Sequence, residues 1–523
     1  MHRILIADPI EDSGLEILRA GGAEVRVVQP EERGRLAELL PGHDALVVRS
    51  ATQVTAELLA HAEGLRVVGR AGIGVDNVDV AAATERGILV VNAPTANVLS
   101  ATEHTFALLL ALARQVPAAD ASMRRGEWER KKFVGMELQG KALGVVGFGR
   151  IGQRVAARAR AFEMNVLAYD PFLDPAVARR LEVELLRLED LLPRCDVVTL
   201  HTPLTEQTKN VLDARRIGLM RPGALLVNCG RGGTVDEAAV LAALDEGRLA
   251  GAAFDVFAQE PPVDRRLAEH PRTVTTPHIG AQTREAQERI ATETARMVLA
   301  ALEGSLSVTA VNLPFSATGT RGEPFLALGE KIGRAAAKMH GGPVSRVEVG
   351  LWGIDEGLRR PLTVAVLKGV LTPSVGDAVN YVNAERLAEA RGVEVVTSTH
   401  SRSADYPHLV GVDLAGGGES VNLSGALFGE SDPRVVDFAG YRLEFRPEGC
   451  LLVLRNRDVP GVVGRLGSIL GDAGINIADI HLARRDGDPE ARAVLRLDQS
   501  PPESVLDTLR ALPEVHSARV LEL

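Results

Sequence analysis

The chain has 523 residues, 46% of them hydrophobic, which is enough apolar material for roughly three or four folded domains. A net charge of −10 and the lack of long basic runs argue against a nucleic-acid partner. The three cysteines show no C-x-x-C spacing, so we expect no disulfide framework and no metal site. No apolar run approaches the roughly 18 residues of a membrane span. We therefore expect a cytoplasmic protein without a signal peptide or a membrane partner.

The first hundred residues alternate short apolar strands with helical stretches. The expected strands are Ile4–Ala7, Ala45–Val48, Arg66–Val68 and Leu89–Val91. This alternation predicts a parallel sheet covered by helices. A long helix, expected from about Ser100 to Gln115, leads into a second series of strands and helices.

The second series contains the glycine motif Gly147–Gly152, G-F-G-R-I-G, between an apolar strand and a helix. In a dinucleotide site these glycines allow a tight turn, close approach of a pyrophosphate and close helix packing. Asp170, eighteen residues after Gly152, ends the next strand, where a carboxylate binds ribose hydroxyls and repels a 2′-phosphate. The neighbouring Pro171 supplies no cation for that phosphate. The motif therefore favours NAD over NADP, with an ordinary glycine-rich turn as the alternative.

Three loops that follow apolar strands of the second series carry Arg231, Glu260 and His278. Oxidation of a 2-hydroxy acid needs a base for the hydroxyl proton, and histidine suits this task. Glu260 would orient His278, and Arg231 would hold the substrate carboxylate through paired hydrogen bonds. Each residue alone could be an ordinary loop residue, but ligands of such sheets bind at these strand ends. Nothing requires Cys229 to be a nucleophile, so we interpret it as a small residue lining the nicotinamide site.

Two further arginines, Arg49 and Arg70, stand at strand ends in the first hundred residues. A substrate with one carboxylate would already be met by Arg231, so these cations indicate a second anionic group such as a phosphate. A solvated surface role for either arginine stays open. The expected substrate-binding residues are Arg49, Ser50, Arg70, Gly72, Ile73, Asn97 and Arg130.

The rest of the chain divides at a linker rich in Gly, Ser and Thr, residues 316–322. A helix expected over Thr283–Leu302 can carry the chain back to the first unit before this linker. From residue 449 the pattern is βαββαβ, which predicts a ferredoxin-like unit. There Asp458 could accept from an amino acid's ammonium, and Asn476 offers a donor and an acceptor. The alternative is that both residues belong to purely structural loops.

The motifs of residues 1 to about 314 resemble the D-isomer-specific 2-hydroxyacid dehydrogenase family. The resemblance lies in GFGRIG, HTPLT, NCGRGG, DVFAQEPP and TPHIGA. It implies two doubly wound parallel-sheet α/β domains with a catalytic triad of Arg231, Glu260 and His278. The cofactor contacts that it implies are Gly147, Gly149, Arg150, Ile151, Gly152, Asp170, Thr202, Cys229, Asp255, Gly280 and Ala281.

The paired arginines and the C-terminal extension resemble the phosphoglycerate-oxidising branch of this family in its long form. The implied domains are substrate-binding (1–97 and 284–314), NAD-binding Rossmann (98–283), α+β intervening (324–448) and amino-acid-binding ACT (449–523). The implied reaction is NAD-dependent oxidation of D-3-phosphoglycerate to 3-phosphooxypyruvate, the first step of phosphorylated L-serine biosynthesis. L-serine would be the effector, and a homodimer or homotetramer is expected. The alternatives are a reductase of glyoxylate, hydroxypyruvate or another D-2-hydroxyacid, and an NAD-sensing corepressor or scaffold.

Overall fold

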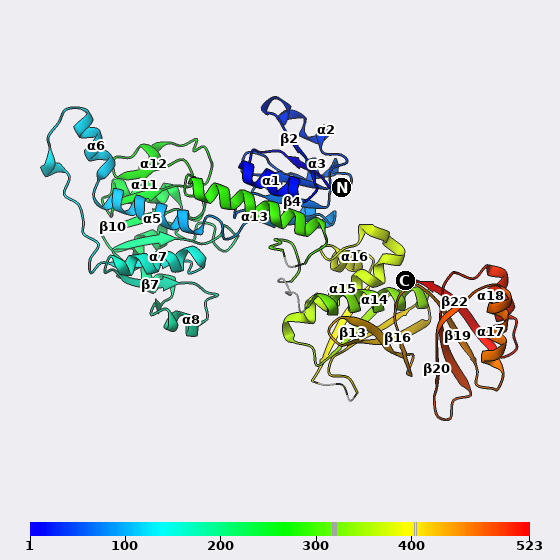
Figure 1. Ribbon diagram of the computed structural model, residues 1–523. Coiled ribbons are helices and arrows are strands. Elements are labelled where there is room, and N and C mark those ends of the chain that lie inside the picture. Colours follow the sequence, from blue (N-terminus) through cyan, green and yellow to red (C-terminus); the bar gives the residue numbers. More distant parts are fainter. Residues whose placement is uncertain (307, 316–321, 402, 404) are drawn as a thin grey trace.

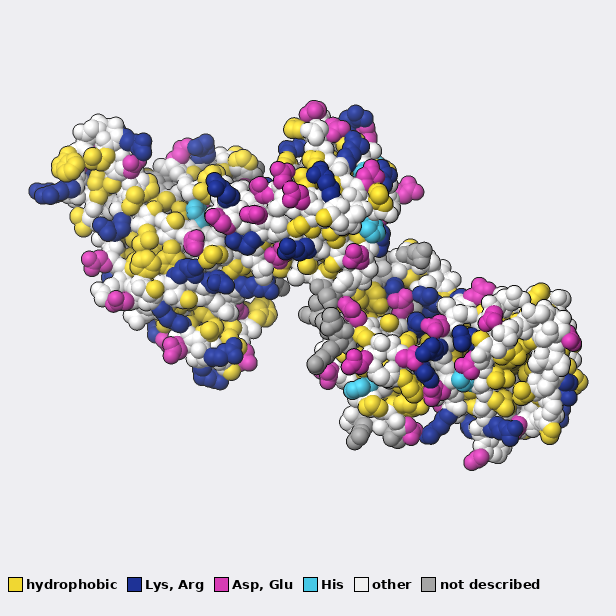
Figure 2. Space-filling view, in the orientation of Figure 1, with side chains coloured by type: hydrophobic (Ala, Val, Ile, Leu, Met, Phe, Trp, Pro, Cys, Tyr) yellow, Lys and Arg dark blue, Asp and Glu magenta, His cyan; other side chains and the backbone are white. Residues whose placement is uncertain are grey.

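The computed structural model describes residues 1–306, 308–315, 322–401, 403 and 405–523. Elements up to α13 lie on one side of the molecule, and those from α14 onward lie on the other (Figure 1). Residues 316–321 of the predicted linker lie outside the described residues. Among the described helices, none has the length and apolar character needed to cross a membrane. Lys and Arg side chains are scattered among Asp and Glu over the face drawn in Figure 2.

The first sheet is parallel and has the order β2-β1-β3-β4-β5. Its strands are β1 (Arg3–Ile6), β2 (Glu24–Val27), β3 (Ala45–Val48), β4 (Val67–Arg70) and β5 (Leu89–Asn92). The helices of this part are α1 (Asp12–Ala20), α2 (Leu36–Leu39), α3 (Ala56–Ala60), α4 (Val80–Glu85) and α13 (Arg284–Leu302). Helix α13 returns from the second sheet and packs on α1, β4 and β5, as the sequence predicts.

The second sheet is also parallel and has the order β12-β11-β10-β9-β6-β7-β8. Its strands are β6 (Ala142–Val146), β7 (Asn165–Tyr169), β8 (Glu184–Leu185), β9 (Val197–Leu200), β10 (Ala224–Asn228), β11 (Leu249–Phe254) and β12 (Thr273–Thr275). Its main helices are α5 (Val98–Ala113), α6 (Val116–Arg124), α7 (Arg150–Ala161), α8 (Pro175–Arg180), α10 (Ala214–Leu219), α11 (Glu237–Asp245) and α12 (Arg266–Glu269). Strand order reverses between β6 and β9, so a crevice for a ligand is expected at the carboxyl ends of these strands.

The third sheet is mixed, with the order β14-β13-β15-β16-β17-β18, and its one parallel pair is β13–β14. Its strands are β13 (Arg346–Trp352), β14 (Glu394–His400), β15 (Leu409–Gly416), β16 (Glu419–Phe428), β17 (Asp432–Phe438) and β18 (Tyr441–Phe445). The helices that accompany it are α14 (Glu323–His340), α15 (Glu356–Val375) and α16 (Ala384–Ala390). This is the α+β intervening unit that the sequence predicts.

The fourth sheet is antiparallel, with the order β20-β21-β19-β22. Its elements are β19 (Cys450–Arg457), α17 (Val462–Asp472), β20 (Ile477–Arg484), β21 (Glu490–Leu497), α18 (Glu503–Arg510) and β22 (Val515–Glu522). The predicted fold class, including the βαββαβ order, is confirmed. The exact domain boundaries stay a prediction.

Helices α14 and α15 approach each other closely because glycines face backbone at their contact. A Cβ on Gly369 would lie 2.1 Å from the carbonyl oxygen of Glu330, and one on Gly333 would lie 2.4 Å from that of Val366. The residues around this contact, among them Leu362 and Leu328, are fully buried. The backbones have no room to accept a methyl group without moving apart.

We predict that Gly369→Ala lowers the free energy of unfolding of the intervening unit by about 1–3 kcal/mol, the usual cost of overpacking. Gly357→Ala is the matched control because the same helix leaves open space there. Alanine favours helix over glycine, so the control should be neutral or stabilising by up to about 1 kcal/mol. Denaturant unfolding of the full chain measures both. Equal stability of the two variants would contradict this packing argument.

Candidate active site

The glycine turn between β6 and α7 has the geometry that a pyrophosphate requires. Gly147 has a φ of 89°, and a Cβ there would lie 2.8 Å from the backbone of His201. A Cβ on Gly152 would lie 2.2 Å from the carbonyl oxygen of Gly147, which explains the close strand–helix packing. A Cβ on Gly149 would meet nothing within 4 Å. The turn is therefore open at Gly149, where Arg150 and Ile151 begin the helix and its first N–H groups lack helical acceptors.

Asp170 stands directly after β7, beside the glycine turn. Its carboxylate accepts from the backbone N–H groups of Phe148, at 2.8 Å, and Phe172, at 2.9 Å. The hydroxyl of Thr202 is buried next to Gly147 and has no hydrogen-bond partner among the described residues. A buried polar atom without a partner is expected where a ligand completes the site. These residues fit NAD.

Cys229 is buried at the end of β10. Burial raises the pKa of its thiol to about 12, so the side chain is neutral at physiological pH. A neutral buried thiol is a poor nucleophile. This agrees with the interpretation of Cys229 as a small lining residue.

A cleft of about 620 Å³ lies between the two parallel sheets, at their carboxyl ends. It brings together all three predicted catalytic residues and six of the seven predicted substrate residues. Its lining includes Arg49, Ser50, Arg70, Gly72, Ile73, Asn97, Arg231, Glu260 and His278. The exception, Arg130, lies in a short turn (Arg130–Lys132) on the arm after α6, away from the first sheet (Figure 1). Within one chain Arg130 does not join the cleft, and its role stays a prediction.

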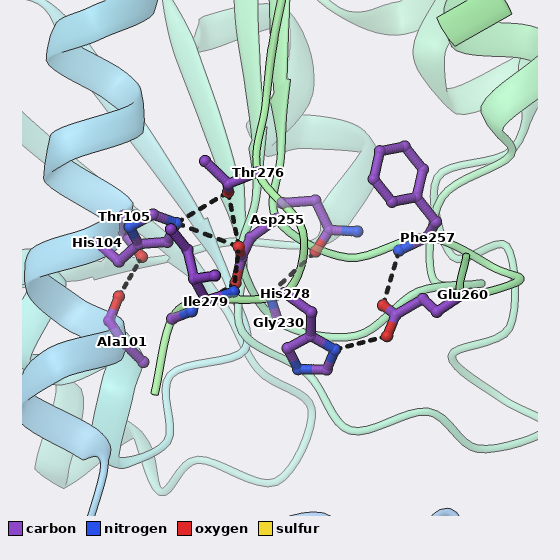
Figure 3. A network of polar contacts seen from close by, with 12 residues as sticks. Ala101, His104, Thr105, Gly230, Asp255, Phe257, Glu260, Thr276, His278 and Ile279 are labelled. Atoms are coloured by element: carbon purple, nitrogen blue, oxygen red, sulfur yellow. Dashed lines mark hydrogen bonds and ion pairs between the residues drawn. The ribbon is translucent and has the colours of Figure 1, made fainter. Parts of the chain in front are cut away.

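The side chains of His278 and Glu260, which both line the cleft, point toward each other (Figure 3). His278 Nδ1 lies 2.6 Å from Glu260 Oε2, and the backbone N–H of Phe257 donates to Glu260 Oε1 at 3.1 Å. The hydrogen bond with Glu260 raises the pKa of His278, and burial opposes it. Burial raises the pKa of Glu260, but the hydrogen bonds from His278 and Phe257 outweigh it and leave this pKa lowered. The carboxylate is therefore placed to stabilise an imidazolium.

Arg231 enters the cleft from the loop after β10. Its Nη1 donates to the carbonyl of Gly230 at 2.8 Å, and its Nε lies 3.3 Å from Asp76 Oδ2 of the first unit. Since Asp76 is well exposed, this ion pair is worth little and a substrate anion can replace it. The guanidinium is therefore held at the cleft and can still bind a substrate carboxylate.

Arg70 and Asn97 carry buried polar atoms that lack partners. Arg70 Nε and Asn97 Oδ1 have none among the described residues. Burial and the nearby charge of Arg231 lower the pKa of Arg70 to about 10, so it remains a cation at neutral pH. Its Nη1 donates a long bond of 3.4 Å to the carbonyl of Ala71, so an anionic ligand in the cleft would supply the partner that the buried Nε lacks.

Several residues that shape the cleft were not predicted from the sequence. Gln287 of α13 accepts from Arg49 and donates to the carbonyl of Ala281 at 2.7 Å. Asp8 accepts from the backbone N–H of Arg49 at 2.7 Å and so fixes that loop. No motif marks these residues, because their roles depend on contacts between distant parts of the chain.

The two predicted regulatory residues lie at opposite ends of the fourth sheet. Asp458 follows Arg457, which pairs with Glu490 of β21, and it forms an ion pair with Arg484 at 3.1 Å. Asn476 precedes Ile477, and Ile477 pairs with Leu497 at the other end of β21. The side-chain amide of Asn476 donates to Asp498 at 2.8 Å. The distance along β21 from Glu490 to Leu497 is about 23 Å at roughly 3.3 Å per residue. One amino acid therefore cannot contact both residues of the same chain, and the role of these residues as an effector site stays a prediction.

Comparisons with known proteins agree with this geometry. Residues 106–280 match the family model "D-isomer specific 2-hydroxyacid dehydrogenase, NAD binding domain". Residues 322–439 match the D-3-phosphoglycerate dehydrogenase intervening domain, and residues 451–514 match the ACT domain. A D-lactate dehydrogenase from Aquifex aeolicus, solved with NAD and lactic acid, is 28% identical with a TM-score of 0.52, covering 58% of this chain and 96% of that one.

The sheets, the glycine turn and the cleft thus define an NAD-dependent 2-hydroxyacid dehydrogenase. Two full-length relatives narrow the class. D-3-phosphoglycerate dehydrogenase of Methanocaldococcus jannaschii is 40% identical, and that of Bacillus subtilis is 38% identical, each over 100% of both chains. The chain belongs to the D-3-phosphoglycerate dehydrogenase family.

We predict that Glu260→Gln shifts the acidic limb of the kcat/KM profile for hydroxyacid oxidation to lower pH. The base must be neutral to accept a proton, so activity rises with pH through the pKa of His278, which Glu260 raises. The plateau should also fall, about tenfold to a hundredfold, because the imidazolium loses a charge-assisted hydrogen bond of about 1.5–3 kcal/mol. The test is the pH dependence of NADH formation.

Glu237→Gln is the control for this test. Glu237 accepts from the N–H of Ala258 at 2.6 Å and so holds the same loop without contacting His278. Its acidic limb should stay in place. A shift of equal size in both variants would show that loop position, rather than the charge of Glu260, sets the limb.

Proposed function

We propose that this protein oxidises D-3-phosphoglycerate to 3-phosphooxypyruvate with NAD, as the first step of phosphorylated L-serine biosynthesis. The observation that carries the proposal is the set of three arginines at one cleft, among which the partly buried Arg70 has a buried Nε without a partner among the described residues. Arg231 is enough for the carboxylate of a 2-hydroxy acid. Arg49 and Arg70 then remain for the phosphate that distinguishes this substrate from smaller hydroxy acids.

The residues divide the chemical task between them. NAD, when bound, supplies the acceptor for the hydride. With Nδ1 engaged by Glu260, Nε2 of His278 is the ring nitrogen left to take the proton of the substrate hydroxyl. Glu260 stabilises the resulting imidazolium, and Arg231 holds the carboxylate and polarises the adjacent oxygen. These roles are part of the proposal.

The alternatives have less support. A glyoxylate or hydroxypyruvate reductase would share the fold, and a glyoxylate reductase structure from Paecilomyes thermophila is 28% identical over 59% of this chain. An NAD-sensing corepressor or scaffold would have no need for a base, its carboxylate and the arginine at one cleft.

The deciding measurement compares D-3-phosphoglycerate with D-glycerate, which differs only by the phosphate. The wild-type protein should form NADH from D-3-phosphoglycerate at alkaline pH. Arg70→Gln should lower kcat/KM for D-3-phosphoglycerate about tenfold to a hundredfold, the loss of one charge-assisted contact, with a much smaller effect on D-glycerate. Arg19→Gln, an exposed arginine of α1, is the control.

The proposal fails if D-3-phosphoglycerate gives no NADH while glyoxylate or hydroxypyruvate is rapidly reduced with NADH. An equal loss on both substrates in Arg70→Gln would leave the reaction intact but remove Arg70 from phosphate binding.

We further propose a cytoplasmic homo-oligomer that binds L-serine. The arm after α6 exposes large apolar side chains, and hydrophobic side chains gather beside it on the face drawn in Figure 2. Trp128 is 79% exposed and Val134 is 76% exposed, which is costly for a free monomer. Pairing of ACT units could also bring Asp458 of one chain near Asn476 of another. The free cysteines agree with a reducing compartment.

We predict that L-serine binds the oligomer and lowers its activity severalfold or more, the usual range for coupling of about 1–3 kcal/mol. Calorimetry and initial rates with the full chain at millimolar L-serine are the measurements, with sedimentation velocity to give the assembly state. Asp458→Ala should abolish binding while basal activity persists. Binding by a monomer, or unchanged binding by Asp458→Ala, would contradict the shared site.

A further inference from the structure

A histidine outside the predicted triad joins the catalytic loop to a helix. His104 lies on α5, and its side chain is 15% exposed. Its Nε2 lies 3.2 Å from Asp255 Oδ1 and 3.0 Å from Thr276 Oγ1 (Figure 3). Among the described residues, His104 is the one basic side chain within ion-pair distance of Asp255.

Asp255 is the centre of the loop that carries His278. Its carboxylate, 1% exposed, accepts from Thr276 Oγ1 at 2.6 Å and from the N–H groups of Ile279 and Gly280, both at 2.8 Å. Burial by itself raises the pKa of Asp255, but the bonds from His104, Thr276 and these N–H groups outweigh it and hold the pKa below its ordinary value. The loop is therefore wrapped around a buried anion.

The conformation of His278 needs this support. Its φ of 55° lies in the left-handed region, which a residue with a side chain adopts only when surrounding contacts impose it. The N–H of His278 donates to the carbonyl of Asp255 at 2.8 Å, so the position of Asp255 sets the start of the turn. A displaced Asp255 would move the imidazole relative to Glu260.

His104 also stands where the two catalytic units connect. Asn97, which lines the cleft, directly precedes α5, and α13 begins at Arg284, soon after the His278 loop. These two segments carry the chain from the first sheet to the second and back. His104 lies on the first of these segments. It contacts Asp255 and Thr276, which lie just before the second segment and the His278 loop.

We propose that His104 is a positioning residue for the reaction, because its bonds to Asp255 and Thr276 hold the His278 loop in the conformation that faces Glu260 and the cleft. It touches neither substrate nor cofactor in this role. The inference rests on the proposed dehydrogenase function. Any 2-hydroxy acid that the wild-type protein oxidises can be used to test it. Failure of the proposed phosphoglycerate substrate is therefore distinguished from failure of the role of His104.

His104→Leu should lower kcat about tenfold to a hundredfold, the usual cost of losing a partner that orients a functional group. The Kd for NADH, from its fluorescence, should change several times less than kcat, because the glycine turn stays intact and only the expected cofactor contacts of the His278 loop are loosened. His104→Gln keeps an N–H donor of similar reach and should recover kcat to within about fivefold of wild type. A merely structural role predicts no such recovery and no separation of kcat from Kd.

His270→Gln is the matched control, since His270 lies in the same unit, is 11% exposed and sits 3.5 Å from Asp245, away from the cleft. It should keep wild-type kcat. If His104→Leu does not fold, Thr276→Val replaces it, because this removes the hydroxyl between His104 and Asp255 and should give the same loss. A wild-type kcat in either variant, or equal losses in His104→Leu and His104→Gln, overturns the proposal.

Discussion

The catalytic edge of the molecule depends on one buried carboxylate, that of Asp255. Parallel strands bring the loops after β10, β11 and β12 to the same edge of the sheet. Strand alignment alone, however, does not place a side chain accurately enough to form a particular hydrogen bond. Asp255 does this by collecting two N–H groups and a hydroxyl from the loop of His278. Loss of the carboxylate would leave those donors buried without acceptors, and the cost of that loss stabilises the observed turn.

The cleft between the two sheets also gathers positive charge, and the mutual repulsion of these charges destabilises the arrangement. Arg70 lies partly buried near Arg231, and its pKa is lowered by desolvation and by the repulsion from Arg231. Asp76 offsets part of this charge from the surface, and Gln287 holds Arg49 through a neutral amide. A substrate with two anionic groups therefore stabilises the arrangement, whereas a substrate with a single carboxylate leaves a cation unpaired. The proposed specificity for a phosphorylated substrate rests on this deficit of negative charge.

The sequence predicts most of this organisation, because periodic apolar strands and glycine turns are local signals. The four units, the NAD turn and the triad all follow from such patterns. Strand β2 escapes detection because Glu24–Val27 is a short edge strand with exposed charges. His104 and Gln287 escape for a different reason, since each matters through contacts more than a hundred residues away in the chain. The separation of Asp458 from Asn476 likewise needs the register of β21, which spacing in the sequence does not give.

The contact between the catalytic and C-terminal parts combines exposed polar pairs with the packing of Leu306 and Phe315 on the core of the third-sheet unit. Asn380 donates to the carbonyl of Gly87 at 2.6 Å, and Arg386 pairs with Glu85 at 2.9 Å, with both charged side chains about half exposed. Exposed pairs of this kind contribute about 0–1 kcal/mol. Gly87 leads into β5, whose Asn92 donates to the carbonyl of Ile73 at 2.6 Å in the substrate cleft. Under the proposed regulation, exposed pairs of this strength would give way to a modest difference in effector affinity between two domain arrangements, whereas a large apolar interface would resist it.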